Sequence, residues 1–514
     1  MGKFKKVLLL VVALCMMISI MSIAAAATGD NPVAKIGDTT YASLADAIAA
    51  AQAGDTIELI ADDNVSLTSG GGLVIDKSLT INGNEFTVYG TPDQTGTNDI
   101  FITGSGTVSI NGLNVEGFGY NCSTDPAHAP IYVSTGFTGT VNLSGVSISR
   151  FNRGGLFLYG GTFHVENCTI DCANSRSGAF TKGIEIKGAA TGTIADTTIF
   201  NMERSGSDSV AGIELYGTGS VLVDGCTILS DGVNHQSVKA TYGIVSSRVG
   251  VHDPSGGSLT VKDTYIDVTN AALSVADSDE YGPVNGYTMI VEDCTFANYV
   301  ATWSASSSIT IKSGEFAEDV YVDAGTIYIE GGTFTNFAPD GNVVITGGIF
   351  DADPTAFVAE GYKATDNGDG TWTVAPADVY TAAASAATGN LSLGGSGSTF
   401  RFTITKNGTK LTTTAEYSAE KDNWELVYDP AYIELTKTAV SGSGIGYTVK
   451  ALKAGETTIT FRKIADHTIT ASTVLTNKHA VFITYNRGTD DSGNKYLLEK
   501  GALTSNKITF DGVP

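Results

Sequence analysis

The chain has 514 residues and a formal charge of −24 at pH 7, because 54 acidic residues outnumber 30 basic ones. Such an acidic surface repels phosphate backbones, which argues against nucleic-acid binding. The 61 glycines, against only 11 prolines, are typical of turn-rich β structure, and the length is sufficient for two or three domains.

The first 27 residues have the pattern of a secretory signal peptide. Three lysines precede an apolar run, 7–23, and four alanines follow it. We expect cleavage near Ala26 or Ala27; an uncleaved membrane anchor is the alternative. Loss of the three lysines leaves 27 basic residues against 54 acidic ones, a formal charge of −27. No later stretch is apolar enough to span a bilayer, so no membrane span is expected after cleavage.

A short amphipathic helix is predicted over residues 43–53, with Ser43 as its N-cap and Gly54 as its stop. Four apolar side chains share one face of this helix: Leu44, Ala47, Ile48 and Ala51. A strand over residues 56–60 follows. We expect the helix to cover the open N-terminal end of the β structure, because an open end exposes unpaired strand groups.

One short pattern recurs eleven times between Leu79 and Phe350. Its eight positions are, in order, an apolar residue, any residue, an apolar residue, two polar or small residues, a variable residue, any residue and a final apolar residue. The copies begin at residues 79, 108, 141, 163, 192, 221, 259, 289, 309, 327 and 343. The early intervals are mostly near 29 residues, and the last three are 20, 18 and 16. Recurrence at periods of about 20–50 residues indicates a stack of like units.

Apolar and polar residues alternate within each copy, which is the periodicity of a strand. The longer units carry a second strand upstream: 131–133, 156–158, 184–186, 213–215 and 244–245. No helical pattern separates these strands, so βαβ units are excluded. The sequence therefore predicts a parallel β-helix, in which inward residues of successive coils stack about 4.8 Å apart.

The stack is predicted to close with a hairpin over Tyr362–Val374. Its Asn-Gly and Asp-Gly steps suit the positive φ angles of a tight turn. The Asp366–Asp369 cluster is also open to interpretation as a calcium loop, but it lacks the full oxygen-ligand spacing with a terminal glutamate. We favour the turn.

Two segments resemble a known family. AKIGDTTYASLADAIAAAQAGD (34–55) is similar to the opening segment of β-helix surface proteins from Gram-positive bacteria, and VAEGYKATDNGDGTWTV (358–374) is similar to their closing segment. The resemblance covers roughly residues 33–375 and implies a right-handed β-helix with the pectate-lyase-like fold, in a cell-surface setting. That fold is shared by pectate-lyase-like enzymes, phage tailspikes and adhesins, so it does not choose a function.

After Pro376 the composition shifts to alanine, serine and glycine, as in a linker. Regular short strands then suggest a β-sandwich: 399–405, 424–428, 433–435, 447–451 and 457–462. The segment LKAGETTITF (452–461) resembles the closing strands of bacterial Ig-like domains, and 479–485 is expected to be the last strand. The sequence shows no Leu-Pro-x-Thr-Gly sorting signal and no surface-layer-homology repeat, so the mode of surface attachment stays open.

These observations predict an all-β chain in five parts. The parts are a signal peptide (1–27), an N-terminal helical cap (28–61), a parallel β-helix with its closing hairpin (62–375), an Ig-like β-sandwich (376–485) and a tail (486–514). The structure of the tail and the oligomeric state are left open.

Five cysteines remain after the signal peptide, an odd and sparse set that does not resemble a disulfide framework. Cys168, Cys226 and Cys294 fall at one position of the repeat, where we expect small buried side chains. Neither Cys-x-x-Cys nor His-x-His spacing accompanies them, so no metal site is indicated. No cofactor is expected, and Ca²⁺ has no support beyond the turn aspartates.

The pectinolytic β-helix enzymes offer a test for catalysis. Their hydrolases share an Asn-Thr-Asp, Asp-Asp, His-Gly and Arg-x-Lys series, which this sequence lacks: Asp62-Asp63 precedes the repeats, and Asp490-Asp491 lies in the tail. The sequence also has no Gly-x-Ser-x-Gly elbow and no phosphate-binding loop. The remaining candidate is one outward face of the upstream strands.

Two columns of side chains define that candidate face. The first column contains Phe101, Tyr132, Phe157, Glu185 and Glu214 and continues at Val245; the second contains Tyr159, Lys187 and Tyr216. Glu185 and Glu214 are expected about 5 Å apart on adjacent coils. That separation suits the two carboxylates of a retaining glycosidase, and crowding would raise the pKa of one of them.

Three interpretations of this face remain. It is a solvated sheet face on which Lys187 offsets charge, a strip that binds carbohydrate through its aromatic rings, or a catalytic pair. We accordingly expect an exported, non-catalytic surface or adhesin-like protein whose partner is carbohydrate or cell-wall glycan. The alternatives are a polysaccharide lyase or glycoside hydrolase using Glu185 and Glu214, and a purely structural component of a wall or filament.

Overall fold

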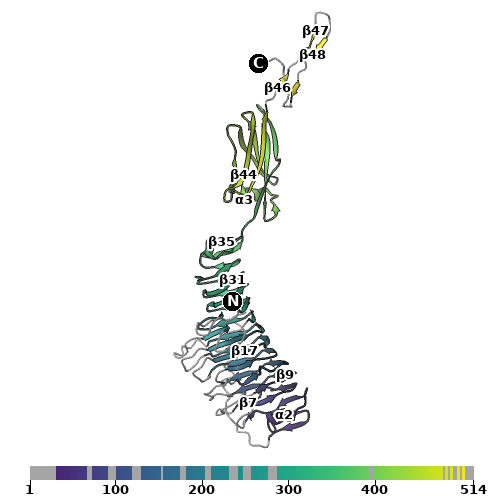
Figure 1. The fold of residues 1–514 in the computed structure, drawn as a ribbon, viewed down its shortest axis with the longest axis vertical. Coiled ribbons are helices and arrows are strands. Elements are labelled where there is room, and N and C mark those ends of the chain that lie inside the picture. Colours follow the sequence, from purple (N-terminus) through teal and green to yellow (C-terminus); the bar gives the residue numbers. More distant parts are fainter. Residues whose placement is uncertain are drawn as a thin grey trace. The chain divides into compact units, whose positions relative to one another are not determined.

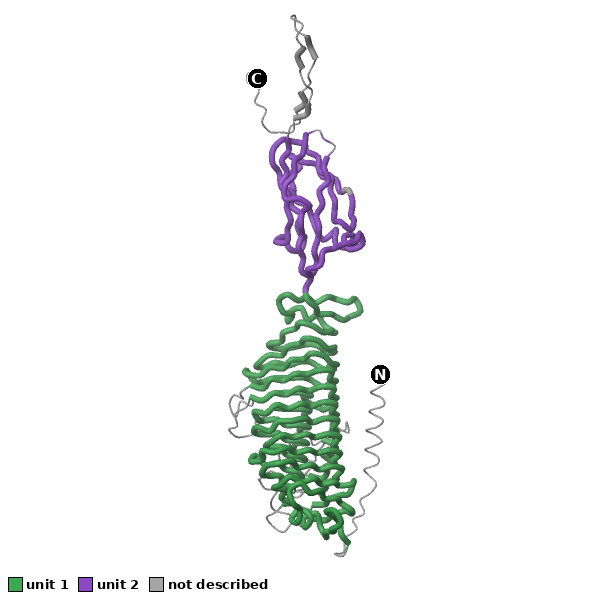
Figure 2. The backbone as a smooth tube through the Cα atoms, turned by 90° about the vertical axis from the view of Figure 1, so that its right-hand side faces the viewer, with its two compact units in different colours: residues 1–376 green, residues 377–514 purple. Residues whose placement is uncertain are grey.

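The computed structural model describes residues 31–514, except for the segments 66–71, 91–99, 118–128, 152–153, 174–180, 203–209, 231–240, 247–255, 276–285, 394, 396, 479–480, 484–486, 490–494, 498–500 and 504–514. The predicted signal peptide and Cys122 lie outside the described residues. The chain divides into two compact units, 1–376 and 377–514 (Figure 2). Each unit is described by itself.

Unit 1 is a stack of parallel strands, as the repeat predicts (Figure 1). A wide coil contributes three strands, for example β11 (Ile131–Val133), β12 (Thr140–Ser144) and β13 (Ser147–Ser149), and each pairs in register with its counterparts on the neighbouring coils. The strands form two long sheets. The architecture is therefore that of a parallel β-helix.

The larger sheet holds two series of strands, which become continuous in the narrow coils at β29 (Val300–Ile311) and β31 (Val320–Ile329). The upstream series also contains β5 (Leu73–Ile75), β8 (Ile100–Ile102), β14 (Gly154–Leu158), β17 (Thr181–Gly188), β20 (Val210–Gly217), β23 (Thr241–Ser246) and β26 (Leu273–Val275). The downstream series also contains β3 (Thr56–Leu59), β6 (Leu79–Asn82), β9 (Thr107–Asn111), β15 (Thr162–Glu166), β18 (Thr191–Ala195), β21 (Ser220–Asp224), β24 (Ser258–Lys262), β27 (Thr288–Glu292) and β33 (Val343–Ile345).

The second sheet holds the strand that ends each copy of the repeat. Its parallel members, besides β13, are β4 (Asp63–Val65), β7 (Thr87–Gly90), β10 (Asn114–Glu116), β16 (Thr169–Asp171), β19 (Thr198–Phe200), β22 (Thr227–Leu229), β25 (Tyr265–Asp267), β28 (Cys294–Phe296), β30 (Gly314–Phe316), β32 (Thr333–Phe334) and β34 (Gly348–Phe350). All eleven predicted copies thus begin in a strand of the larger sheet, and ten of them end in a strand of this one; the first copy ends at Phe86, one residue before β7.

The two polar or small residues of the repeat form the corner between these sheets. The fifth position of seven copies has φ between 45° and 63°: Gly112, Gly145, Asn167, Asp196, Gly225, Asp263 and Asp293. Only glycine, asparagine and aspartate adopt this left-handed conformation at low cost. The corner therefore explains why the sequence pattern alternates between these three residue types.

The core of unit 1 is one apolar column. Inward side chains of successive coils lie in register and are buried: Ile81, Ile110, Leu143, Val165, Ile194, Val223, Val261 and Val291. Burial of such side chains stabilises a fold by about 1.5–3 kcal/mol each relative to exposure. The alternation seen in the sequence is the pattern of this column.

The N-terminal segment contains the helix α2 (Leu44–Ala50) and the strands β1 (Ala34–Ile36) and β2 (Thr39–Tyr41). The Ser43 side chain accepts a hydrogen bond from the Asp46 N–H, which makes Ser43 the N-cap as predicted. The helix is shorter than the predicted 43–53, because Ala51 is already extended. Seven residues do not make an evident helical cap, and β1 pairs antiparallel with β3 at this end of the sheet.

The predicted hairpin is confirmed as β35 (Tyr362–Asp366) paired antiparallel with β36 (Trp372–Pro376). Strand β36 also pairs antiparallel with β34, which ends the parallel stacking of the second sheet. In the turn, Asp366 accepts a hydrogen bond from the Gly368 N–H and Asp369 accepts one from the Thr371 N–H. These carboxylates therefore hold the turn backbone.

Unit 2 contains two small sheets whose side chains form one apolar core. The first sheet has β37 (Tyr380–Ala384), β39 (Ser398–Lys406), β40 (Thr409–Lys410), β42 (Ile433–Ser441) and β43 (Gly444–Ala451); the second has β38 (Thr388–Ser392), β41 (Trp424–Val427), β44 (Gly455–Lys463) and β45 (Thr470–Lys478). Phe402 of the first sheet and Trp424 of the second both stack against Phe461, with ring centroids 4.9 and 4.7 Å from it. The helix α3 (Thr414–Glu420) packs beside β42.

Two expectations for this part of the chain were wrong. The alanine-rich segment after Pro376 is not a linker, because β37 and β38 belong to the two sheets. The last strand of those sheets is β45, whereas β46 (Val481–Ile483) pairs with β49 (Gly501–Leu503) in a separate two-stranded sheet. Within the predicted tail, β47 (Arg487–Thr489) pairs with β48 (Lys495–Leu497).

Candidate functional site

The structure places the predicted columns side by side on the upstream series of strands. Phe101, Tyr132, Phe157, Glu185 and Glu214 are successive register partners on β8, β11, β14, β17 and β20. Lys187 and Tyr216, of the second column, are register partners on β17 and β20. The alignment of the repeat therefore gave the right neighbours. Their roles in binding or catalysis stay predictions.

The interpretation of this face as solvated is wrong. Glu185 is only 2% exposed, and Glu214 and Phe157 are fully buried. The other five candidates are half-buried: Phe101, Tyr132, Tyr159, Lys187 and Tyr216. Alternation along a strand separates the two faces of a sheet, but it does not reveal whether the outer face is covered.

The aromatic side chains of the face pack on one another. Phe101 and Tyr132 are stacked, with ring centroids 5.5 Å apart, and Phe157 and Tyr159 are stacked at 5.3 Å. Tyr132 meets both Phe157 and Tyr159 edge to face. This mutual packing reduces the ring surface that is available to any other molecule.

Both carboxylates share one lysine. The Lys182 Nζ atom lies 2.8 Å from Glu185 Oε2 and 3.0 Å from Glu214 Oε2. The Tyr159 hydroxyl donates a hydrogen bond to the other oxygen of Glu185. We call Lys182, Glu185 and Glu214 the ionic cluster. Its buried charges form two ion pairs, which offset the cost of burying them.

Lys187 lies between the rings of Tyr159 and Tyr216. Its Nζ atom lies 5.7 Å from the Tyr159 ring centroid and 5.5 Å from the Tyr216 ring centroid, within the range of a cation–π interaction. The two tyrosines therefore interact with the glutamates of the ionic cluster and with a second ammonium group. The predicted role of Lys187 in offsetting the charge of the glutamates stays a prediction.

The pKa shifts follow from burial and charge. Burial and the nearby charges of the two glutamates hold the pKa values of Tyr159 and Tyr216 far above their usual range. Burial alone would lower the pKa of Lys182, but the Glu214 and Glu185 carboxylates outweigh it and raise that pKa. At neutral pH both phenols are protonated and Lys182 is charged.

The sequence did not reveal Lys182 as a member of this site, because Lys182 lies three residues before Glu185. In a regular strand, residues 182 and 185 point to opposite faces, but the pairing of β17 with β20 skips Gly183. A Cβ at Gly183 would lie 2.7 Å from the carbonyl oxygen of Gly212 and from Ile199 of the other sheet. Gly155, Gly212 and Gly243 are similarly enclosed. A recurring glycine followed by isoleucine or leucine is the sequence signal for this irregularity.

The cysteines occupy a corner position shared with threonine. The thiols of Cys168, Cys226 and Cys294 each donate to the carbonyl two residues earlier, at 3.2–3.5 Å, and the hydroxyls of Thr197 and Thr264 do the same. All three cysteines are free and buried, which confirms the sequence interpretation. Burial raises the pKa of Cys168 to about 11 and those of Cys226 and Cys294 to about 12.

In the part of the chain that the structure describes, no group of three or more His, Cys, Asp or Glu side chains is arranged to hold a metal ion. Among the same residues, no helix has both the length and the apolar character needed to cross a membrane. Comparisons with protein-family models, with curated proteins and with solved structures found no match. The function is therefore argued from the chain's own residues.

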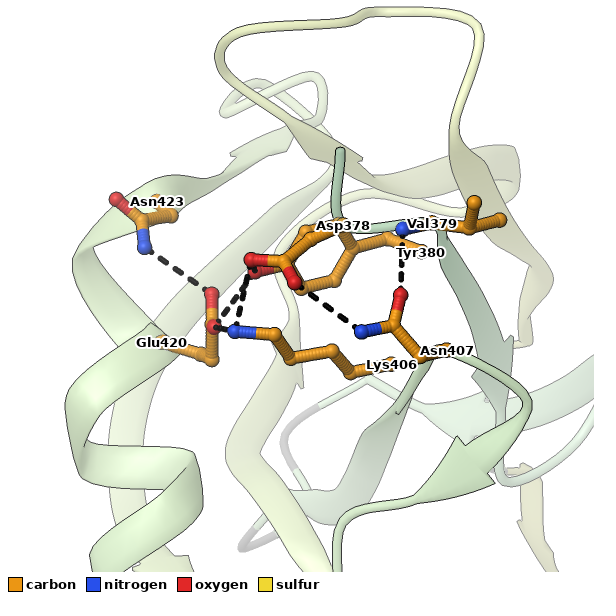
Figure 3. Close-up of polar contacts among 7 residues, drawn as sticks. All are labelled: Asp378, Val379, Tyr380, Lys406, Asn407, Glu420 and Asn423. Carbon is orange, nitrogen blue, oxygen red and sulfur yellow. Dashed lines mark hydrogen bonds and ion pairs between the residues drawn. The ribbon is translucent and has the colours of Figure 1, made fainter. Parts of the chain in front are cut away.

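Unit 2 holds a second polar network, which anchors its first residues (Figure 3). The Lys406 ammonium lies 3.0 Å from Asp378 and 3.4 Å from Glu420. The Tyr380 hydroxyl donates to Glu420 at 2.8 Å, and Asn407 bonds both Asp378 and the Val379 N–H. These contacts attach the start of β37 to β39 and to α3, which is a structural role.

Proposed function

We propose that the chain is an exported, non-catalytic surface protein, adhesin-like, whose stacked coils serve as a stiff scaffold. The observation that supports this proposal is the ionic cluster: the two carboxylates that a glycosidase would need are buried and bridged by Lys182. A carboxylate that attacks or protonates a glycosidic bond must contact the sugar. Glu185 and Glu214 are 2% and 0% exposed. Stabilisation of the stack is the simpler role for them.

Carbohydrate or cell-wall glycan is the ligand that we propose for the outer rim of this face. The half-buried Tyr132, Tyr159 and Tyr216 offer aromatic surface, and Lys187 offers an ammonium donor. Aromatic rings with a polar handle are suited to a ligand that has both apolar and hydroxylated faces. The same rings already pack on one another, so we expect weak binding that gains strength through multivalent display.

The finer fold assignments belong to the same proposal. We propose a right-handed β-helix of the pectate-lyase-like fold, because nearly all parallel crossovers take this hand. Its N-terminal end is covered by β1, β2 and α2, where Asp63 accepts a hydrogen bond from the Leu44 N–H at 2.7 Å and Lys77 donates to the Ala51 carbonyl at 3.1 Å. Unit 2 is proposed to be an Ig-like spacer or docking module. The signal peptide implies export.

The experiment compares the mature chain with its Glu185→Gln/Glu214→Gln variant. Both proteins are screened for binding to a glycan array, and both are incubated with acidic and neutral polysaccharides for analysis of released products. The proposal predicts glycan binding by both proteins and no product from either. Product release by the parent, lost in a variant that still folds, would establish the enzyme. Absence of both binding and product would favour a purely structural wall or filament component.

A further inference from the structure

A cleft lies in the narrow coils, where β29 and β31 begin. It has a volume of about 420 Å³, is open to solvent, and is lined by Tyr299, Trp303, Glu318, Asp319 and Tyr321. This volume is in the range of small-molecule sites, about 300–1,000 Å³. Three aromatic rings and two carboxylates therefore gather at one place. One of the rings belongs to Trp303, and the whole chain contains only three tryptophans.

This cleft is the far end of the face described above. The first column continues from Val245 through Ser274 and Ala301 to Tyr321, each residue being the register partner of the next. Trp303 follows Ala301 by two residues on β29, and its ring contacts the Tyr321 ring of the column. The column predicted from the sequence stops at Val245, because serine and alanine interrupt it before an aromatic residue returns at Tyr321.

The rings of the cleft form walls and do not make one flat platform. The Trp303 and Tyr321 centroids are 5.7 Å apart, and their planes are inclined by 46°. Tyr321 is 38% exposed. The Tyr299 hydroxyl bonds Asn270 Oδ1, which fixes this third ring. A flat pyranose stacks best on a flat platform, whereas inclined ring faces suit a compact, rounded group.

The cleft carries unneutralised negative charge. Asp319 Oδ1 accepts hydrogen bonds from the Val320 and Ala338 N–H groups at 2.7 and 3.1 Å, which holds this carboxylate in place. Burial and the neighbouring charges of Glu318 and Asp340 raise the pKa of Asp319. Among the residues that the structure describes, no lysine or arginine forms an ion pair with any of these three carboxylates.

We propose that this cleft binds a small organic ammonium cation, the ring faces of Trp303 and Tyr321 contacting its alkyl groups and Glu318 and Asp319 supplying the counter-charge. Ring faces attract cations through their quadrupoles, and carboxylates beside them add to this attraction. A bare divalent cation would require six or more oxygen ligands, which these two side chains do not supply. This site is separate from the rim for which carbohydrate is proposed, and it does not depend on that proposal.

The test is calorimetric titration of the full chain with choline and with its neutral isostere, 3,3-dimethylbutan-1-ol. The two probes share a shape and differ in charge, so they separate cation recognition from apolar burial. We expect choline to bind at least about tenfold more tightly than the isostere, as expected for cation–π contacts reinforced by carboxylates. Higher salt should weaken choline binding, because the site is open to solvent.

Three variants locate the binding. Trp303→Leu and Glu318→Gln/Asp319→Asn should each weaken choline binding at least about fivefold, whereas Trp303→Phe should retain most of it. Tyr328→Ala is the matched control, because Tyr328 is also exposed on β31, at 41%, and does not line the cleft. It should leave choline binding unchanged. Circular dichroism confirms that each variant keeps its β structure.

Four outcomes would overturn the proposal. They are equal affinity for choline and the neutral isostere, absence of choline binding at millimolar concentration, unchanged binding in both the Trp303→Leu and the double carboxylate variant, and displacement of choline by Ca²⁺ at equal concentration. Binding of neutral oligosaccharides with loss of affinity in Trp303→Leu, in the absence of choline binding, would reassign the cleft to sugars.

Discussion

At the scale of single residues, the corner of the repeat links sequence to backbone most directly. Seven corner positions have a left-handed backbone, and each is glycine, asparagine or aspartate. A β-branched residue in this conformation places its side chain against the backbone at a cost of about 1–2 kcal/mol. The residue types at the corner positions are thus determined by the backbone conformation there.

Asn167 tests this explanation. Asn167→Val should lower the free energy of unfolding by about 1–2 kcal/mol, because valine resists the φ of 53° at this position. Asn167→Gly is the matched control and should be close to neutral. Denaturant unfolding of the full chain measures both. An equal decrease in the free energy of unfolding in the two variants would show that the asparagine side chain, and not the left-handed backbone, accounts for the stabilisation.

At the scale of elements, the network around Lys406 attaches β37 to β39 and α3. Burial raises the pKa of Glu420, but hydrogen bonds from Asn423 and Tyr380 and the charge of Lys406 outweigh it, so the pKa lies below its ordinary value of 4.5. Because the folded state holds this carboxyl ionised, its stabilisation is complete above pH 4.5 and decreases as the pH falls through the lowered value.

This pH dependence can be measured locally. Hydrogen–deuterium exchange in β37 should accelerate as the pH falls below about 4.5, after correction for the intrinsic exchange rate. Glu420→Gln should remove part of that change, since glutamine does not titrate. Glu434→Gln, an exposed carboxylate on β42, is the control and should keep the pH dependence of the parent. Identical profiles for all three proteins would exclude Glu420 as the source.

The sequence predicts strands well where apolar and polar residues alternate strictly, and poorly where the side chains on the two faces of a strand are similar. Every copy of the repeat is a strand, because its inward residues build the buried column. Strand β37 was mistaken for a linker because alanines follow Tyr380 and give little contrast between the two faces. The Lys182–Glu185 contact was missed because the irregularity at Gly183 breaks the alternation of side chains along the strand. The burial of the candidate face was missed because it depends on which residues cover the face.

At the scale of the whole unit, the last parallel strand of the second sheet, β34, does not present a free edge. Strand β36 pairs antiparallel with β34 and with β35, so the second sheet closes on a hairpin. An unpaired edge is a template for association with another chain. We infer that the hairpin protects the stack from end-to-end growth.

Thr373→Pro tests this protection. Proline at the centre of β36 removes an N–H between two partner strands and should destabilise the hairpin by about 3 kcal/mol. Sedimentation velocity should then show concentration-dependent self-association of the variant. Thr373→Val, which preserves the backbone donor, should remain like the parent. A Thr373→Pro variant that sediments as the parent does would mean that the hairpin is not needed for this purpose.

The central claim is that the ionic cluster stabilises the stack and performs no chemistry. The most direct test is the free energy of unfolding of Lys182→Met, compared with the triple variant Lys182→Met/Glu185→Gln/Glu214→Gln. Loss of the lysine alone leaves two buried carboxylates together, so we expect a decrease of about 3–5 kcal/mol, most of which the triple variant should recover. An unchanged free energy of unfolding in Lys182→Met would contradict the account, because the carboxylates would then not depend on their structural partner.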